Sequence, residues 1–313
     1  MSGVGFGKAI LFGEHFVVYG LPGIAAAIEL NTTCFFEKNS DRKEGIFAND
    51  LVTGELIKYG EHPEKRLAEV LSIIFSELNF KEKNFHLKLV TNMSVKGGMG
   101  SSAALAVSIC KCLDKEFSLN LDNAFVNDVA YKVEKLFHSN PSGIDNTVST
   151  YGGLIRFRKK NGGNEIEKIM LKKPVEMVLV DTGLIRDTGE AVDFVKKQKE
   201  ENPKKFEGIF SGYVGIEKEA LVAVKKEQWE KVGKLMNKNQ LLLKEMNVSS
   251  KELDEIIDTA LDAGAFGAKL TGAGLGGNAI ILSPGKELQE KVAKACTKKG
   301  YNSYKILVGM LGD

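Results

Sequence analysis

A cluster of glycines followed by two serines occupies residues 96–102, where the chain reads Lys-Gly-Gly-Met-Gly-Ser-Ser. An alternating apolar run over residues 85–90 precedes it and an Ala-rich run over 103–113 follows it, so the pattern predicts a strand, a glycine loop and a helix. Glycines let the backbone approach a ligand closely, and the N–H groups at the start of a helix attract anions. The segment therefore predicts a phosphate site, where the serine hydroxyls cap the helix or reach a phosphate or a metal ion.

The same glycine pattern is also compatible with two different structures. A glycine–serine turn often caps a helix without binding a ligand. The segment lacks the order of a P-loop but fits the loose G-x-G-x-x-A form at Gly98, Gly100 and Ala103, which is typical of a dinucleotide fold. A literal G-x-G-x-x-G lies at residues 272–277, but a strand over 278–282 is predicted after it where a dinucleotide fold opens a helix.

Polar residues also interrupt the apolar sequence near the N-terminus. Lys8 lies in an apolar run over residues 6–12 that is typical of a strand. Glu14 and His15 separate that run from a second one over 16–19, which predicts two strands with a charged break between them. The pair is either a hydrogen-bonded corner or a ligand contact.

Two acidic residues occupy a second region. Glu134 lies off the centre of the apolar stripe of a helix predicted to end near residue 137, and such a residue is ordinarily solvated. Asp145 belongs to a dense turn cluster over 138–146 and is placed to cap a helical turn at 147–150. Neither residue indicates chemistry by itself.

The remaining elements follow from periodicity and turn residues. Further strands are predicted at 24–37, 154–157, 166–171, 175–180 and 304–308, with an exposed hairpin over 39–60. Further helices are predicted from residue 67, after the N-cap Asp122, from 190 to 263 with breaks near 202, 228 and 247, and over 286–297. The change of pattern near residue 171 predicts two domains, 1–170 and 171–313.

Composition excludes several classes of function. The chain has 313 residues, 43% of them hydrophobic and 27% charged, with a net charge of +2, so nothing favours nucleic acid or a membrane surface as partner. The four cysteines show neither zinc spacing nor a disulfide framework, and this predicts free thiols in a reducing cytosol. The sequence shows no signal peptide and no run of about 18 apolar residues, so we expect a cytoplasmic protein.

Four separated motifs resemble those of one kinase superfamily. Residues 7–20 resemble the N-terminal signature of mevalonate kinases. Residues 97–103 resemble the ATP-phosphate loop of the galactokinase, homoserine kinase, mevalonate kinase and phosphomevalonate kinase (GHMP) superfamily. Residues 140–146 resemble its catalytic-aspartate segment, and residues 269–277 its third glycine motif. The motifs stand in the expected order and span almost the whole chain.

Within the superfamily, mevalonate kinases match best. Galactokinases usually follow Gly-Glu-His with an aspartate that binds sugar hydroxyls, whereas Phe16, Val17 and Val18 follow it here, which suits a branched apolar substrate. The chain departs from the usual motifs at four positions, namely Phe6, Ser94, Leu275 and Asn278.

The resemblance implies an α+β, two-domain GHMP kinase fold. It implies a ribosomal protein S5 domain 2-like N-terminal domain, a ferredoxin-like α/β C-terminal domain and an active site in the cleft between them. The implied activity is ATP-dependent phosphorylation of the primary hydroxyl of mevalonate, in the route to isoprenoids, by a homodimer. Alternatives are another small-molecule kinase of the superfamily, acting on phosphomevalonate or a sugar, or a non-catalytic ligand sensor.

The resemblance also implies roles for individual residues. Asp145 orients or deprotonates the substrate hydroxyl, Lys8 lies beside it, and Ser102 and Glu134 coordinate Mg²⁺. The ATP phosphates are bound by Lys96, Gly97, Gly98, Met99, Gly100, Ser101 and Ser102. Candidates for the substrate are Glu14 and His15 at its hydroxyls, Arg186 at its carboxylate, and Thr271.

Overall fold

The computed structural model describes residues 1–39, 44–93, 98–138, 141–160, 163–184 and 188–311. Ser94, Lys96, Gly97 and Arg186 lie outside the described residues, so their predicted roles have no structural counterpart here. The remaining candidate residues are all described.

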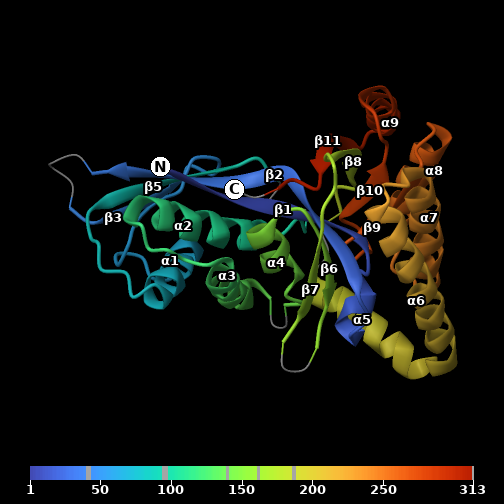
Figure 1. Ribbon diagram of the computed structural model, residues 1–313, viewed down its shortest axis with the longest axis horizontal. Helices are drawn as coiled ribbons and strands as arrows, with labels where there is room; N and C mark the ends of the chain where they lie inside the picture. Colours follow the sequence, from blue (N-terminus) through green and yellow to red (C-terminus); the bar gives the residue numbers. More distant parts are fainter. Residues whose placement is uncertain (40–43, 94–97, 139–140, 161–162, 185–187, 312–313) are drawn as a thin grey trace.

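Strands and helices alternate irregularly along the chain (Figure 1). The strands are β1 (Ser2–Phe12), β2 (Gly23–Lys38), β3 (Ile46–Asp50), β4 (Leu56–Lys58), β5 (Phe85–Thr91), β6 (Leu154–Arg158), β7 (Glu165–Ile169), β8 (Val175–Asp181), β9 (Gly267–Thr271), β10 (Asn278–Leu282) and β11 (Asn302–Val308). The helices are the 3₁₀ helix η1 (His15–Tyr19), α1 (Arg66–Glu77), α2 (Ser101–Phe117), α3 (Asn123–Phe137), α4 (Ile144–Tyr151), α5 (Thr188–Glu201), α6 (Pro203–Lys225), α7 (Trp229–Glu245), α8 (Lys251–Asp262) and α9 (Lys286–Lys298).

One mixed sheet runs through both halves of the molecule in the order β4-β3-β5-β2-β11-β8-β10-β9. β1 and β6 also pair with β2, and β7 pairs with β6. β11 joins the halves, because it pairs with β8 along its length and with β2 at Val308 opposite Ile28. The architecture is the α+β class that the resemblance implied.

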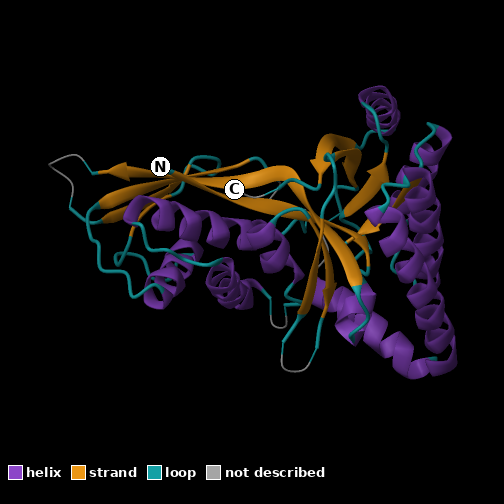
Figure 2. Ribbon diagram, in the orientation of Figure 1, coloured by secondary structure: helices purple, strands orange, loops and turns teal. Residues whose placement is uncertain are grey.

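Helices cover the sheet differently in the two halves (Figure 2). α1, α2 and α3 lie together on one face of the N-terminal strands, where Leu71, Val107 and Val129 form part of a separate buried cluster. α6, α7 and α8 lie together beside the C-terminal strands, while α9 lies near β11. Apolar faces at helical spacing are buried in both halves, as the periodicity predicted.

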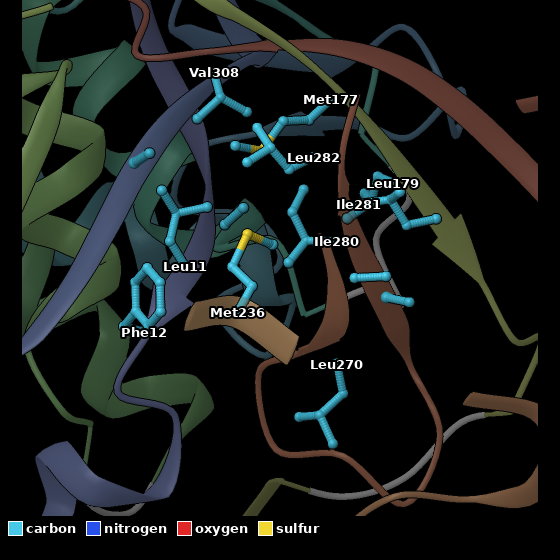
Figure 3. Close-up of a cluster of buried hydrophobic side chains, with 14 of the residues drawn as sticks. Leu11, Phe12, Met177, Leu179, Met236, Leu270, Ile280, Ile281, Leu282 and Val308 are labelled. Carbon is cyan, nitrogen blue, oxygen red and sulfur yellow. The ribbon is translucent and has the colours of Figure 1, made fainter. Parts of the chain in front are cut away.

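The largest core crosses residue 170. Figure 3 shows Leu11 and Phe12 of β1 beside Met236 of α7, together with Ile280 of β10 and Val308 of β11. These side chains are almost completely buried. A shared core and a shared sheet join the two predicted domains closely, and the boundary at 170 and 171 stays a prediction.

Two local predictions were wrong in detail, and one strand was missed. Residues 16–19 belong to η1 rather than to a strand, because Gly13 at φ 122° turns the chain and Gly20 at φ 75° ends the 3₁₀ helix. α4 begins at Ile144, with Gly143 as its N-cap, so Asp145 lies inside the first turn instead of capping it. β9 was not predicted, because its run of five residues contains a glycine and a lysine.

Other predictions about the hairpin, the helices and the thiols are confirmed. β3 and β4 form an antiparallel hairpin, and Asp122 caps α3 by accepting a hydrogen bond of 2.7 Å from the Phe125 N–H. The helix breaks near residues 202, 228 and 247 occur where they were expected. All four cysteines are free and buried. Within the described ranges, no helix is long and apolar enough to cross a membrane.

Candidate active site

Lys8 and Asp145 meet between β1 and α4. The Lys8 ammonium lies 3.3 Å from Asp145 Oδ1, and the two side chains are 7% and 23% exposed. The backbone N–H of Lys8 also donates to the carbonyl of Met99 at 2.8 Å, which ties β1 to the end of the glycine loop. The pair holds the Asp145 carboxylate in a fixed place beside a cation, where it can act as a base or as an orienting acceptor.

Gly100 packs directly against this pair. A β-carbon at this position would lie 3.3 Å from Lys8 Cγ and 3.5 Å from Asp145 Cβ. The residue also has φ 75° and is the N-cap of α2. Only glycine combines this left-handed backbone with such close neighbours without strain.

The first turn of α2 receives no hydrogen bond from a side chain of its N-cap residue. Gly100 has no side chain that could accept hydrogen bonds from the first-turn N–H groups, and Ser101 is the first helical residue. Because a 17-residue helix begins here, its N–H groups and its dipole favour negative charge. Met99, by contrast, is 4% exposed and contributes to the core, so its side chain packs inside the protein rather than against a ligand.

Glu134 is a buried carboxylate on α3. It is 1% exposed, so the expectation of a solvated helix face was wrong. Ser102 Oγ donates to Glu134 Oε1 at 2.5 Å. Burial raises the pKa of Glu134 to about 7, the Asp145 charge adds to this, and the Ser102 hydroxyl and Lys8 oppose it.

These oxygen donors suit a divalent cation. A buried carboxylate close to a second carboxylate is stabilised by added positive charge, and a serine hydroxyl provides another hard ligand. No group of three or more His, Cys, Asp or Glu residues forms a metal cage in the described part of the chain. Mg²⁺ commonly binds through one or two protein oxygens and completes its shell with water and phosphate oxygens, which matches Ser102 and Glu134.

α4 is held against α3 by a pair of asparagines. Asn146 Nδ2 donates to Asn127 Oδ1 at 2.8 Å, and Asn146 is 2% exposed. Thr147 Oγ1 donates to the carbonyl of Gly143 at 2.6 Å within the first turn of α4. These bonds fix Asp145, on α4, relative to Glu134, on α3.

Glu14 lies in a buried network rather than at an open surface. Its carboxylate forms an ion pair with Lys269 in which both side chains are 0% exposed. Glu14 Oε2 also accepts hydrogen bonds from the Gly13 N–H at 3.1 Å and from Asn239 Nδ2 at 3.3 Å. This placement argues against direct contact between Glu14 and a substrate hydroxyl.

His15 and Thr271 join the first motif to the third. His15 is 2% exposed, and its Nε2 lies 2.8 Å from the carbonyl of Ala273. Because a carbonyl only accepts, Nε2 is the donor, and burial lowers the pKa of this histidine. Thr271 Oγ1 accepts from the Ile10 N–H at 2.9 Å and donates to the Ile10 carbonyl at 3.1 Å.

The third glycine motif is a turn between β9 and β10. Leu275, where the superfamily usually has glycine, adopts φ 57° and donates its N–H to the carbonyl of Val248 at 2.7 Å. Thr182 Oγ1 donates to the carbonyl of Gly277 at 2.8 Å, so the end of β8 supports the same turn. Leu275 therefore adopts a left-handed backbone conformation that glycine adopts more easily.

The sequence matches two protein-family models in chain order. The model described as "GHMP kinases N terminal domain" matches residues 65–153, and the one described as "GHMP kinases C terminal" matches residues 220–302. It is 37% identical over 306 residues to the mevalonate kinase of Pyrococcus abyssi, a match that covers 92% of this chain and 89% of that protein. The chain belongs to the mevalonate kinase family of GHMP kinases. As a kinase of this family it uses ATP as co-substrate.

Solved structures of the mevalonate kinase family share the fold. The L. major mevalonate kinase in complex with R-mevalonate superposes with a TM-score of 0.88 at 31% identity, covering 98% of this chain and 95% of that one. The Methanococcus jannaschii mevalonate kinase superposes with a TM-score of 0.83 at 26% identity, covering 100% and 98% of the two chains. The relationship therefore extends over the whole chain and includes every described motif.

Proposed function

We propose that this protein transfers the γ-phosphoryl group of ATP to the primary hydroxyl of mevalonate, giving 5-phosphomevalonate and ADP. The observation that carries the proposal is the Lys8–Asp145 pair beside the Ser102–Glu134 hydrogen bond at the start of α2. It brings a base, a counter-charge and hard oxygen ligands to one helix N-terminus. The similarity to the L. major protein, whose structure holds R-mevalonate, supports this choice of substrate.

In the proposed mechanism, Asp145 accepts the proton of the attacking hydroxyl or orients that hydroxyl toward the phosphorus. Lys8, whose ammonium group lies beside the Asp145 carboxylate, stabilises the negative charge that develops during transfer. The N–H groups at the start of α2, together with the glycine loop over residues 96–100, hold the ATP phosphates. Mg²⁺, bound by Ser102 and Glu134, would neutralise phosphate charge.

We propose three residues for recognition of the substrate. Arg186 remains the candidate for the mevalonate carboxylate. His15 and Thr271 stay candidates near the substrate, although both make hydrogen bonds to backbone groups. We also propose that the protein is cytoplasmic and forms a homodimer.

A panel of acceptors with ATP tests the proposed function. A coupled assay for ADP release is run with mevalonate, phosphomevalonate, galactose and homoserine at equal concentrations. We expect turnover with mevalonate and little with the others. Turnover with phosphomevalonate or a sugar instead would change the substrate within the superfamily, and binding of ATP and mevalonate without turnover would indicate a ligand sensor.

A further inference from the structure

The buried ion pair between Lys269 and Glu14 links segments that are 255 residues apart in the sequence. Lys269 lies on β9, at the start of the third glycine motif. Glu14 lies at the corner where β1, the strand that carries Lys8, passes into η1. An ion pair without exposed surface is costly to form, because both charges lose their hydration.

Each charged group of the pair has its hydrogen bonds arranged around it. Lys269 Nζ donates to the Glu14 carboxylate and, at 2.5 Å, to the carbonyl of Leu270. Glu14 also accepts from the Gly13 N–H and the Asn239 amide. Burial lowers the pKa of Lys269, and the Glu14 charge opposes that shift. Both side chains are thus committed to each other rather than to a ligand.

Two further sets of hydrogen bonds join the same two segments of the chain. Thr271 bonds both backbone groups of Ile10, and the Ala273 carbonyl accepts from His15. Lys269, Thr271 and Ala273 are alternate residues of the third motif, and each contacts the stretch over residues 10–15. We call these three contacts the clasp.

The corner that the clasp holds has little freedom. Gly13 has φ 122°, and a β-carbon there would lie 2.6 Å from Gly23 Cα and 3.2 Å from Tyr213 Oη. Tyr213 in turn donates to the carbonyl of Pro22 at 2.6 Å. The clasp therefore anchors the end of β1 next to this corner, and its bonds to Ile10 lie two residues after Lys8.

We infer that Lys269 is a positioning residue, which through its buried ion pair with Glu14 holds the Lys8 strand in register with the third glycine motif. The inference rests on the proposed function and assigns Glu14 to the same positioning role. Neither residue contacts the substrate. Lys269 acts on catalysis only through the placement of Lys8 and of the turn over residues 272–277.

The test is a double-mutant cycle of Glu14→Gln, Lys269→Met and the double variant. Each single change leaves one buried charge without its partner, so we expect a lower Tm and a kcat reduced about tenfold or more. The double change removes both charges, so we expect it to regain most of the Tm and most of the kcat. KM for mevalonate should change by no more than about twofold in all three variants.

Gln289→Met is the matched control. Gln289 is buried and bonds the carbonyls of Met177 and Ile306, so its loss weakens the junction of α9 with β8 and β11 but not the corner. We expect a lower Tm with an unchanged kcat. That combination separates general destabilisation from mispositioning, provided that all rates are measured well below the lowest Tm.

Three results would overturn the inference. One is a double variant whose kcat stays as low as that of Glu14→Gln while KM for mevalonate rises steeply, because Glu14 would then be a substrate ligand. Another is wild-type kcat in both single variants. The third is a double variant with no recovery of Tm. The Tm cycle needs no substrate, so it tests the ion pair even if the acceptor panel reassigns the substrate.

Discussion

At the scale of single residues, Asp145 and Glu134 show how one environment gives two carboxylates different tasks. Asp145 is partly exposed and has the Lys8 ammonium 3.3 Å away. Glu134 is buried, bonds the Ser102 hydroxyl, and has a pKa raised to about 7. The environment of Asp145 provides an acceptor that solvent and substrate can reach, whereas the environment of Glu134 favours a group that binds a proton or a cation.

Replacement of Asp145 by asparagine tests the first task. The amide keeps the shape but carries no charge and cannot accept the hydroxyl proton, so we expect kcat to fall by about 100-fold or more. ATP affinity should change little, because Asp145 is not among the phosphate-binding residues. Single-turnover rates and nucleotide titrations measure the two effects. A kcat close to that of the wild type would remove Asp145 from the mechanism.

Glu134→Gln tests the second task through the pH dependence of stability. The folded-state pKa of Glu134 lies above its ordinary value of 4.5, so the protonated form is favoured in the folded protein and stability falls as the pH rises from about 4.5 through 7. A shift of this size corresponds to about 3 kcal/mol. Between pH 4.5 and 8 the free energy of unfolding of the wild type should therefore fall by about that much relative to Glu134→Gln.

Denaturant unfolding across that pH range measures the difference. Glu69→Gln, on α1 and 38% exposed, controls for the change in net charge. Addition of Mg²⁺ at pH 8 should restore part of the lost stability in the wild type and none in Glu134→Gln. If the free energies of unfolding of the wild type and of Glu134→Gln change with pH in parallel, Glu134 does not titrate as described.

At the scale of elements, the site depends on where α2 begins. Gly100 ends the glycine loop, starts the helix and lies against Lys8 and Asp145. A β-carbon at this residue would therefore disturb the end of the loop, the start of α2 and the Lys8–Asp145 pair together.

We expect Gly100→Ala to lower stability by about 1–2 kcal/mol through its positive φ and to lower kcat about tenfold or more by separating Lys8 from Asp145. Gly54→Ala is the matched control, because Gly54 has the same φ of 75° and nothing within 4 Å of its added β-carbon. That control should lose a similar amount of stability and keep its kcat. Denaturant melts and steady-state rates compare the two variants, and equal rates would contradict the expectation.

The elements themselves were largely predictable from sequence, while their contacts were not. Periodicity and caps located most helices, because those signals are local. The local pattern indicated a solvated Glu134, whereas the resemblance made it a magnesium ligand. Its burial comes from the packing of other elements on α3, which no local pattern shows. The partner of Glu14 could not be found from spacing, since Lys269 is 255 residues away. The sequence indicated only that a lysine, Lys269, lies in a short and mostly apolar run, which calls for a buried partner without naming it. The candidate catalytic and metal-binding residues were identified through resemblance rather than through pattern.

At the scale of the whole molecule, a shared core and a continuous sheet predict cooperative unfolding. Trp229 on α7 is the single tryptophan of the chain, so its fluorescence reports on the C-terminal half, whereas far-UV circular dichroism reports on all helices. We expect the two signals to change together in denaturant, with one midpoint. Two separated midpoints would show that residues 1–170 and 171–313 unfold as independent domains.

The place of β11 in the sheet also has a consequence for synthesis on the ribosome. β2 ends at residue 38, but its neighbour β11 begins only at residue 302. Translation of the intervening 263 residues takes roughly 13 to 53 s at about 5–20 residues per second. While residues 182–301 are made, the edge of β8 that later pairs with β11 still lacks this strand, and open strand edges are surfaces that invite aggregation. We therefore expect chaperones that shield open sheet edges to raise the yield of the folded chain until β11 is made.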